Sequence, residues 1–108
     1  MTKRNVYKMM DAIEGGSVPL YDAFLLAEEL DPLLLYFVLR YLKETYGRDT
    51  QGPGGRLLQF LSDYPQISKF AATPKNEPMI EWFDESYSVR SFKTREDYLE
   101  TIIDKLEG

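Results

Sequence analysis

Residues 32–46 read PLLLYFVLRYLKETY, and this stretch decides the fold. Asp31 followed by Pro32 is a typical helix start and Gly47 is a typical stop, so the stretch predicts one helix over residues 32–46. At about 100° per residue, this helix is apolar around most of its circumference. Its polar stripe consists of Tyr36, Arg40, Lys43 and Glu44, with Leu33 among them. A helix this apolar is normally surrounded by others, so we expect it at the centre of the domain.

Shorter amphipathic helices are expected on both sides of this segment. Residues 3–14 predict a helix that Gly15 and Gly16 end, and a second helix runs to about Leu30 with Ser17 as its cap. Helical spacing then predicts helices over residues 56–64, around Ile67, Phe70 and Ala71, over 76–86 and over 95–106. The short helix around Ile67 is expected to end at Thr73-Pro74, and Thr94 with Asp97 resembles a capping box for the last helix.

Two segments are predicted to be irregular. Residues 47–55, GRDTQGPGG, are rich in turn formers and predict a loop. Residues 87–93, YSVRSFK, alternate polar and apolar side chains, but one strand would have no partner, so a loop is expected here too. Leu58 and Phe70 are expected to point inward, and the third and fourth helices together are expected to hold the centre.

These patterns predict an all-α fold. We expect residues 1–108 to form one compact domain of six to seven short crossing helices around the central apolar helix at residues 32–46.

The chain contains no cysteine and no histidine. This composition excludes a disulfide framework and the commonest zinc sites, which use thiolate or imidazole ligands. It also excludes Ser-His-Asp and Cys-His arrangements. We therefore expect no catalytic residues, no metal and no cofactor, and we favour a protein that is not an enzyme.

Charge and hydropathy point away from membranes and nucleic acids. The net charge of −5 opposes a general affinity for phosphates or anionic lipids. The longest apolar run, residues 33–39, is far shorter than the ~20 residues that span a bilayer. We therefore predict a cytoplasmic protein without membrane attachment, and we do not expect nucleic acid as a partner.

Two groups of residues are candidate binding sites. Trp82, Tyr87 and Phe92 are aromatic residues that could contact a partner protein, or that could belong to the core. Arg48, Gly54, Gly55 and Arg56 surround a predicted helix N-terminus, where free amides attract anions. The lysine and hydroxyl of a phosphate-binding loop are missing, so a plain connector explains these glycines equally well.

Two charged groups are better explained as solvated surface. Glu81, Asp84 and Glu85 share one helix face, but they lack the oxygen pattern of a calcium loop. Arg90, Lys93 and Arg95 lie together with Phe92 between Tyr87 and Tyr98, a pattern that can bind single strands, but three cations are few in an acidic chain.

Three functions remain open. The first is a non-enzymatic interaction or regulatory domain that binds another protein or a second copy of itself. The second is an acidic mimic of nucleic acid that competes for a basic nucleic-acid-binding protein. The third is an enzyme that uses carboxylates or a divalent metal.

Overall fold

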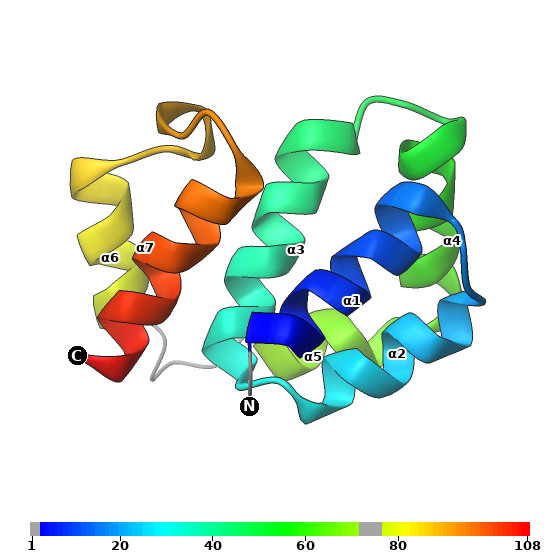
Figure 1. The fold of residues 1–108 in the computed structure, drawn as a ribbon, viewed down its shortest axis with the longest axis horizontal. Coiled ribbons are helices and arrows are strands. Elements are labelled where there is room, and N and C mark those ends of the chain that lie inside the picture. The colour runs from blue at the N-terminus through cyan, green and yellow to red at the C-terminus, as the bar shows by residue number, and fades with distance from the viewer. Residues whose placement is uncertain (1–2, 72–76) are drawn as a thin grey trace.

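The computed structural model describes residues 3–71 and 77–108, and within these ranges the chain is all-α (Figure 1). The helices are α1 (Lys3–Gly15), α2 (Leu20–Glu29), α3 (Pro32–Tyr46), α4 (Gly52–Asp63), α5 (Gln66–Ala71), α6 (Glu77–Ser86) and α7 (Arg95–Glu107), with one 3₁₀ turn, η2 (Val89–Ser91). The Cα radius of gyration is 13.1 Å, as expected for a compact chain of about this length. None of the described helices combines the length and hydropathy that crossing a bilayer requires.

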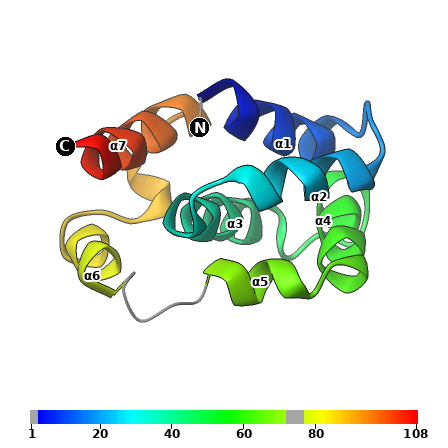
Figure 2. The same cartoon turned by 90° about the horizontal axis from the view of Figure 1, so that it is seen from below.

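Helix α3 has the predicted bounds and the predicted place. The Asp31 carboxylate caps it by accepting a hydrogen bond of 2.8 Å from the Leu33 amide, and Gly47 follows its last turn. Figures 1 and 2 show α3 between the α6 and α7 pair on one side and α1, α2 and α4 on the other. Its buried side chains are Leu34, Leu35, Phe37, Val38, Leu39 and Leu42. Helix α3 is therefore the centre of the fold.

The start and the position of helix α4 both differ from their predictions. It begins at Gly52, so the predicted loop was too long by its last four residues. Gly54 is buried, and a Cβ there would lie 2.4 Å from the carbonyl oxygen of Asp49 and 2.7 Å from that of Tyr46. Glycine thus lets the first turn of α4 pack directly against the preceding backbone. Helix α4 lies at one end of the molecule beside α1, so α3 alone holds the centre (Figure 1).

The start of α2 also differs from its prediction. The N-cap is Pro19, whose φ of −61° and ψ of 148° are extended, and no side chain caps the helix. The expected cap by Ser17 is therefore wrong. Because the proline ring fixes φ, Pro19 itself sets the chain direction into α2. The predicted end of the fifth helix at Thr73-Pro74 lies outside the described residues.

Two apolar side chains expected in the core are exposed. Leu58 is 50% exposed and Phe70 is 43% exposed, whereas their neighbours Leu57, Phe60 and Ile67 are buried. Short helices at the edge of the fold bury only one narrow face, so a step of about 100° from a buried position already reaches the surface.

The C-terminal part agrees with its predictions, except that only the Thr94 half of the expected capping box forms. The Thr94 side chain accepts a hydrogen bond of 3.1 Å from the Asp97 amide and so caps α7. The segment before it contains the short turn η2 and no strand.

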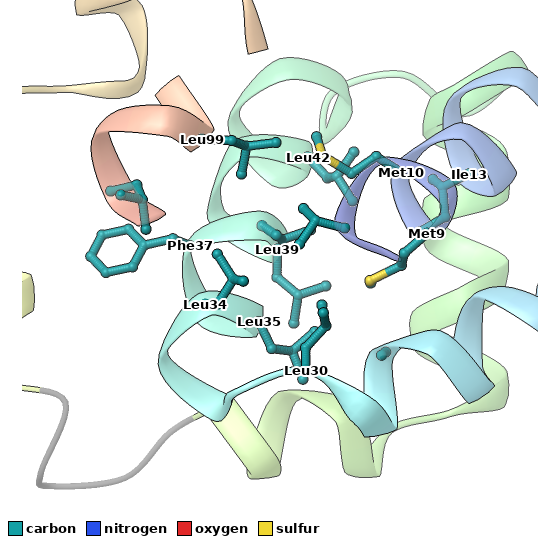
Figure 3. Close-up of a cluster of buried hydrophobic side chains, with 14 of the residues drawn as sticks. Met9, Met10, Ile13, Leu30, Leu34, Leu35, Phe37, Leu39, Leu42 and Leu99 are labelled. Atoms are coloured by element: carbon teal, nitrogen blue, oxygen red, sulfur yellow. The ribbon is translucent and has the colours of Figure 1, made fainter. Parts of the chain in front are cut away.

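The interior has two chemically different regions. The aliphatic core is formed mainly by side chains of α1 and α3, among them Met9, Met10, Ile13, Leu34, Leu35, Leu39 and Leu42 (Figure 3). The aromatic cluster lies between α3, α6, η2 and α7 and consists of Phe37, Phe83, Phe92 and Tyr98. Phe37 projects from α3 on the side away from α1 (Figure 3), and its ring centroid lies 5.3 Å from that of Phe83.

Candidate interaction surfaces

The predicted aromatic residues lie together at the outer edge of the aromatic cluster. The Tyr87 ring centroid lies 5.7 Å from that of Trp82 and 5.3 Å from that of Phe92. Tyr87 is 38% exposed, whereas Trp82 and Phe92 are half-buried. Phe92 stacks on Phe83, and Lys105 Nζ lies 5.0 Å from the Trp82 ring centroid. Most of this aromatic surface therefore packs within the fold, and partner binding at this edge stays a prediction.

Arg56, from the predicted anion site, holds the end of α1. Its Nε and Nη2 atoms donate hydrogen bonds of 2.7 Å each to the carbonyl oxygens of Ile13 and Glu14. These carbonyls belong to the last turn of α1, where backbone acceptors lack helical partners and the helix dipole is negative. Gly16 has a φ of 65°, and a Cβ there would lie 2.9 Å from Arg56 Cζ. Arg56 and Gly16 together therefore form the C-terminal cap of α1.

The other members of that predicted site differ in exposure. Arg48 is exposed, Gly54 is buried and Gly55 is half-buried. Two donors of Arg56 are already used by α1, so Arg48 is the exposed cation among these four residues. Anion binding here stays a prediction.

Arg95 connects three helices through a polar network that the sequence did not indicate. Its Nη2 lies 2.7 Å from Asp11 Oδ1 and its Nη1 lies 2.5 Å from Glu14 Oε1. Its Nε lies 3.1 Å from Glu96 Oε1. The Tyr46 hydroxyl donates to the other carboxylate oxygen of Glu14. The Arg95 network therefore joins α1, the last turn of α3 and the first turn of α7.

Burial and hydrogen bonding change the pKa of two members of the network, Tyr46 and Arg95. Burial raises the pKa of Tyr46, and its hydrogen bond to Glu14 raises it further. Burial alone would lower the pKa of Arg95, but hydrogen bonds to its three carboxylate partners raise it overall. Tyr46 and Arg95 both keep their protons near pH 7, so neither suits proton transfer there. The network holds the three helices together.

The predicted acidic trio on α6 does not converge. Asp84 Oδ1 lies 2.6 Å from Arg40 Nη2, while Glu81 and Glu85 are exposed. Burial would lower the pKa of Arg40, but the hydrogen bond and charge of Asp84 raise it overall. Within residues 3–71 and 77–108, no three acidic side chains lie close enough to hold a metal ion.

The predicted basic cluster is also divided. Arg95 belongs to the network described above, whereas Arg90 and Lys93 are exposed. Tyr98 is fully buried, and its hydroxyl donates a hydrogen bond of 2.7 Å to the Phe37 carbonyl. The buried Tyr98 ring cannot stack on a base, so Tyr87, which is 38% exposed, and the half-buried Phe92 are the rings of this cluster that reach the surface.

A groove of about 510 Å³ lies between α1 and α2 and was not predicted. Ala12 is buried in it and Leu26 is half-buried, whereas Val18 and Leu25 are 43% and 42% exposed. Tyr21, one helical turn before Leu25, is 54% exposed. The polar residues that line the groove are Lys8, Asp11, Ser17 and Asp22. The sequence contains a signal for this surface, because Tyr21 and Leu25 lie outside the face of α2 that helical spacing predicts to be buried, namely Leu20, Ala23, Phe24, Ala27 and Leu30.

A second groove of about 420 Å³ lies between α2, α3 and α5. Its apolar lining includes Leu30, Leu35 and Phe70, and its charged residues are Glu28 and Lys69. One charge of each sign gives this groove no net preference for an anionic or a cationic ligand.

No family model matches the chain, and neither curated proteins nor solved structures give a significant match. Any function must therefore follow from the surfaces of the molecule itself.

Proposed function

We propose that this protein is a non-enzymatic domain that binds another protein. The observation that carries the proposal is a stripe of large apolar side chains on the surface beside the groove between α1 and α2. Val18, Tyr21 and Leu25 are each between 42% and 54% exposed and form this apolar stripe. Neighbouring exposed apolar side chains next to a concave surface are typical of protein-binding sites, because burial against a partner removes them from water.

The arrangement of the polar groups supports the proposal. Arg40 and Arg95, whose side chains are each 22% exposed, are both held in ion pairs that connect helices. The described residues bring together no metal-binding group of carboxylates. An enzyme that relies on carboxylates needs acidic groups that converge in a pocket, so the apolar stripe supports binding better than catalysis.

An acidic modulator of a basic nucleic-acid-binding protein is the second candidate. The net charge of −5 and the acidic residues Asp22, Glu28 and Glu29 on α2 favour it. Recognition by charge alone would weaken steeply with salt and would not need the apolar stripe. The two candidates therefore differ in whether Leu25 contributes to binding.

The test is capture of partners from the source cell with the tagged protein, followed by reconstitution with each purified candidate. We expect one captured protein to form a complex of defined stoichiometry with the wild type, measured by calorimetry. Leu25→Ser should weaken this complex at least about tenfold. Leu58→Ser, which removes a leucine of similar exposure from α4 (50% against 42%), is the matched control and should leave the complex unchanged.

A second surface is tested in the same experiment with Tyr87→Ser at the predicted aromatic edge. If only this variant loses the complex, the binding surface lies at the aromatic edge beside α6, and the proposed function still holds. If no captured protein forms a stoichiometric complex with the wild type, the proposed function is wrong.

A further inference from the structure

We propose that the groove between α1 and α2 binds a basic amphipathic helix of the partner protein. This inference rests on the proposed function and adds the chemistry of the partner. It follows from the shape of the groove, from the spacing of the apolar side chains beside it and from the charges that flank them.

The apolar side chains have the spacing that helix recognition requires. Tyr21 and Leu25 lie one helical turn apart on α2, and Val18 lies in the segment that leads into the helix. Leu26 and Ala12 continue this apolar surface into the groove toward α1. A partner helix that is laid into such a groove presents anchors at positions i, i+3 or i+4, and i+7. The groove volume of about 510 Å³ is sufficient for several such side chains.

The stripe is bordered by negative charge on both sides. At about 100° per residue, Asp22 and Glu29 project on the groove side of Leu25, and Glu28 projects on the other side. All three are exposed, and α2 contains no lysine or arginine. Lysine or arginine side chains that flank the apolar face of a partner helix would meet these carboxylates.

The charged residues on the α1 side of the groove change its net charge little. Of the charged residues that α1 contributes to the groove, Asp11 is already paired with Arg95 at 2.7 Å. Lys8 is the single cation among the groove residues, and it offsets Asp22, the groove carboxylate that Arg95 does not pair. The net negative charge of this surface therefore comes from Glu28 and Glu29 on the exposed face of α2.

The end of α2 adds a second reason for a cationic partner. Glu28 and Glu29 occupy its last turn, which has no basic residue. Carboxylates near a helix C-terminus face the negative end of the helix dipole, which is unfavourable. A lysine or arginine of the partner would relieve this repulsion on binding.

The same charges argue against two other occupants. Two copies of a chain with a net charge of −5 repel each other, and α2 has no basic residue to offer a second copy of itself. An anionic membrane surface would be repelled as well. The groove therefore fits a cationic helix from a different protein.

The experiment selects peptides of about 16 residues from a random displayed library on the immobilised full chain. We expect the enriched peptides to be cationic and to repeat apolar residues at helical spacing. The best peptide is then synthesised and titrated into the chain by calorimetry. Enrichment of acidic or neutral sequences, or no enrichment, would overturn the inference.

Two pairs of variants locate the binding. Leu25→Ser and the triple change Asp22→Asn, Glu28→Gln, Glu29→Gln should each weaken peptide binding at least about tenfold. Their matched controls are Leu58→Ser and the triple change Glu81→Gln, Glu85→Gln, Glu107→Gln, at exposed positions away from the groove. Equal weakening by test and control variants would overturn the inference.

The captured partner separates this inference from the proposed function. If that partner forms a stoichiometric complex but the Leu25 and acidic-triple variants leave it unchanged, the domain binds a protein by another surface and only the inference fails. If sedimentation shows that the wild type pairs with itself through Leu25, the occupant is a second copy and the inference is again wrong.

Discussion

The aliphatic core and the aromatic cluster both pack on α3, but they hold their helices in different ways. In the aliphatic core, flexible methionine and leucine side chains from α1 and α3 fill the space between adjacent helices. In the aromatic cluster, rings meet at defined angles, with Phe83 and Phe92 each nearly perpendicular to Tyr98, at 81° and 86°. Arg40 lies 4.9 Å from the Phe83 ring centroid and covers it.

This difference indicates that the two regions depend on different properties of their side chains. Aliphatic side chains change rotamer at little cost, so the aliphatic core needs volume more than orientation. Rings interact through their faces and edges, so the aromatic cluster needs the right orientation of its side chains as well as the right volume. The N-terminal region should therefore tolerate shape changes that the region around α6 does not.

The largest expected effects come from truncation at the centre of each region. Phe83→Ala should lower the free energy of unfolding by about 3–5 kcal/mol, and Leu42→Ala by about 2–5 kcal/mol, because each leaves a cavity. Urea unfolding followed by circular dichroism measures both. Hydrogen exchange should show that Phe83→Ala exposes mainly amides of α6 and α7. Uniform loss of protection in both variants would mean that the two regions open together.

Conservative changes sharpen the comparison. Leu42→Met keeps apolar volume and should cost less than about 1.5 kcal/mol. Phe83→Leu keeps the residue apolar but removes ring contacts with Phe37, Phe92 and Tyr98. It should therefore cost at least about 1 kcal/mol more than Leu42→Met. Equal costs in the same unfolding assay would show that ring orientation contributes nothing.

The ion pair at the edge of the aromatic cluster should have a smaller effect. Nη1 of Arg40 is buried without a hydrogen-bond partner among the described residues. Asp84→Asn removes the charge that compensates this cation and should cost about 1–2 kcal/mol, because Asp84 is half exposed. Arg40→Met keeps the packing of the stem and removes the buried charge, so it should cost less. The reverse order in urea unfolding would contradict this account.

High pH should destabilise the protein through the buried phenol of the aromatic cluster. Burial raises the pKa of Tyr98 above its ordinary value of 10.0. The folded state therefore keeps the proton, while the unfolded state loses it above about pH 10, so this stability is present below pH 10 and is lost as pH rises. The loss should reach about 1.4 kcal/mol per pH unit.

Tyr98→Phe tests this prediction by removing the titrating group. The variant should be about 1 kcal/mol less stable at neutral pH, because the hydrogen bond to the Phe37 carbonyl is lost. Its stability should then decline less steeply with alkali than that of the wild type. Tyr21→Phe, at an exposed ring, should leave the slope unchanged. Parallel slopes for wild type and Tyr98→Phe would assign the alkaline effect to other groups.

The smallest effects are expected at exposed apolar positions. Leu58→Ser and Leu25→Ser should each change the free energy of unfolding by about 0.5 kcal/mol or less, since neither side chain is buried. If Leu25→Ser lowers the free energy of unfolding more than Leu58→Ser does, Leu25 packs within the fold and is not available to a partner.

The sequence predicted the helices well where local signals mark their ends. The bounds of α3 were correct because Asp31, Pro32 and Gly47 act within one turn of each boundary. The start of α4 was wrong because Gly54 serves close packing against Asp49, which composition alone does not distinguish from a flexible loop.

The candidate surfaces were less predictable because they depend on contacts between residues that are distant in the sequence. In the Arg95 network, Arg95 contacts Glu14 and Asp11, which precede it by 81 and 84 positions in the chain. No local sequence pattern indicates such contacts. The aromatic edge was found as a set, since Trp82, Tyr87 and Phe92 are close in sequence. Their degree of burial depends on distant residues of α7, which places Lys105 over the Trp82 ring and Tyr98 against the Phe92 ring. The groove between α1 and α2 needs both helices in place before it exists.

The position of Trp82 gives the molecule a built-in optical reporter. It is the single tryptophan of the chain, and its ring lies against Phe83, Tyr87 and Lys105 in the region of α6 and α7. Its fluorescence emission therefore follows one half of the protein, whereas a far-ultraviolet signal averages over every helix. If the fluorescence midpoint of unfolding comes before the circular-dichroism midpoint, a state exists in which α6 and α7 have loosened while the N-terminal helices remain folded. No added label is needed to detect it.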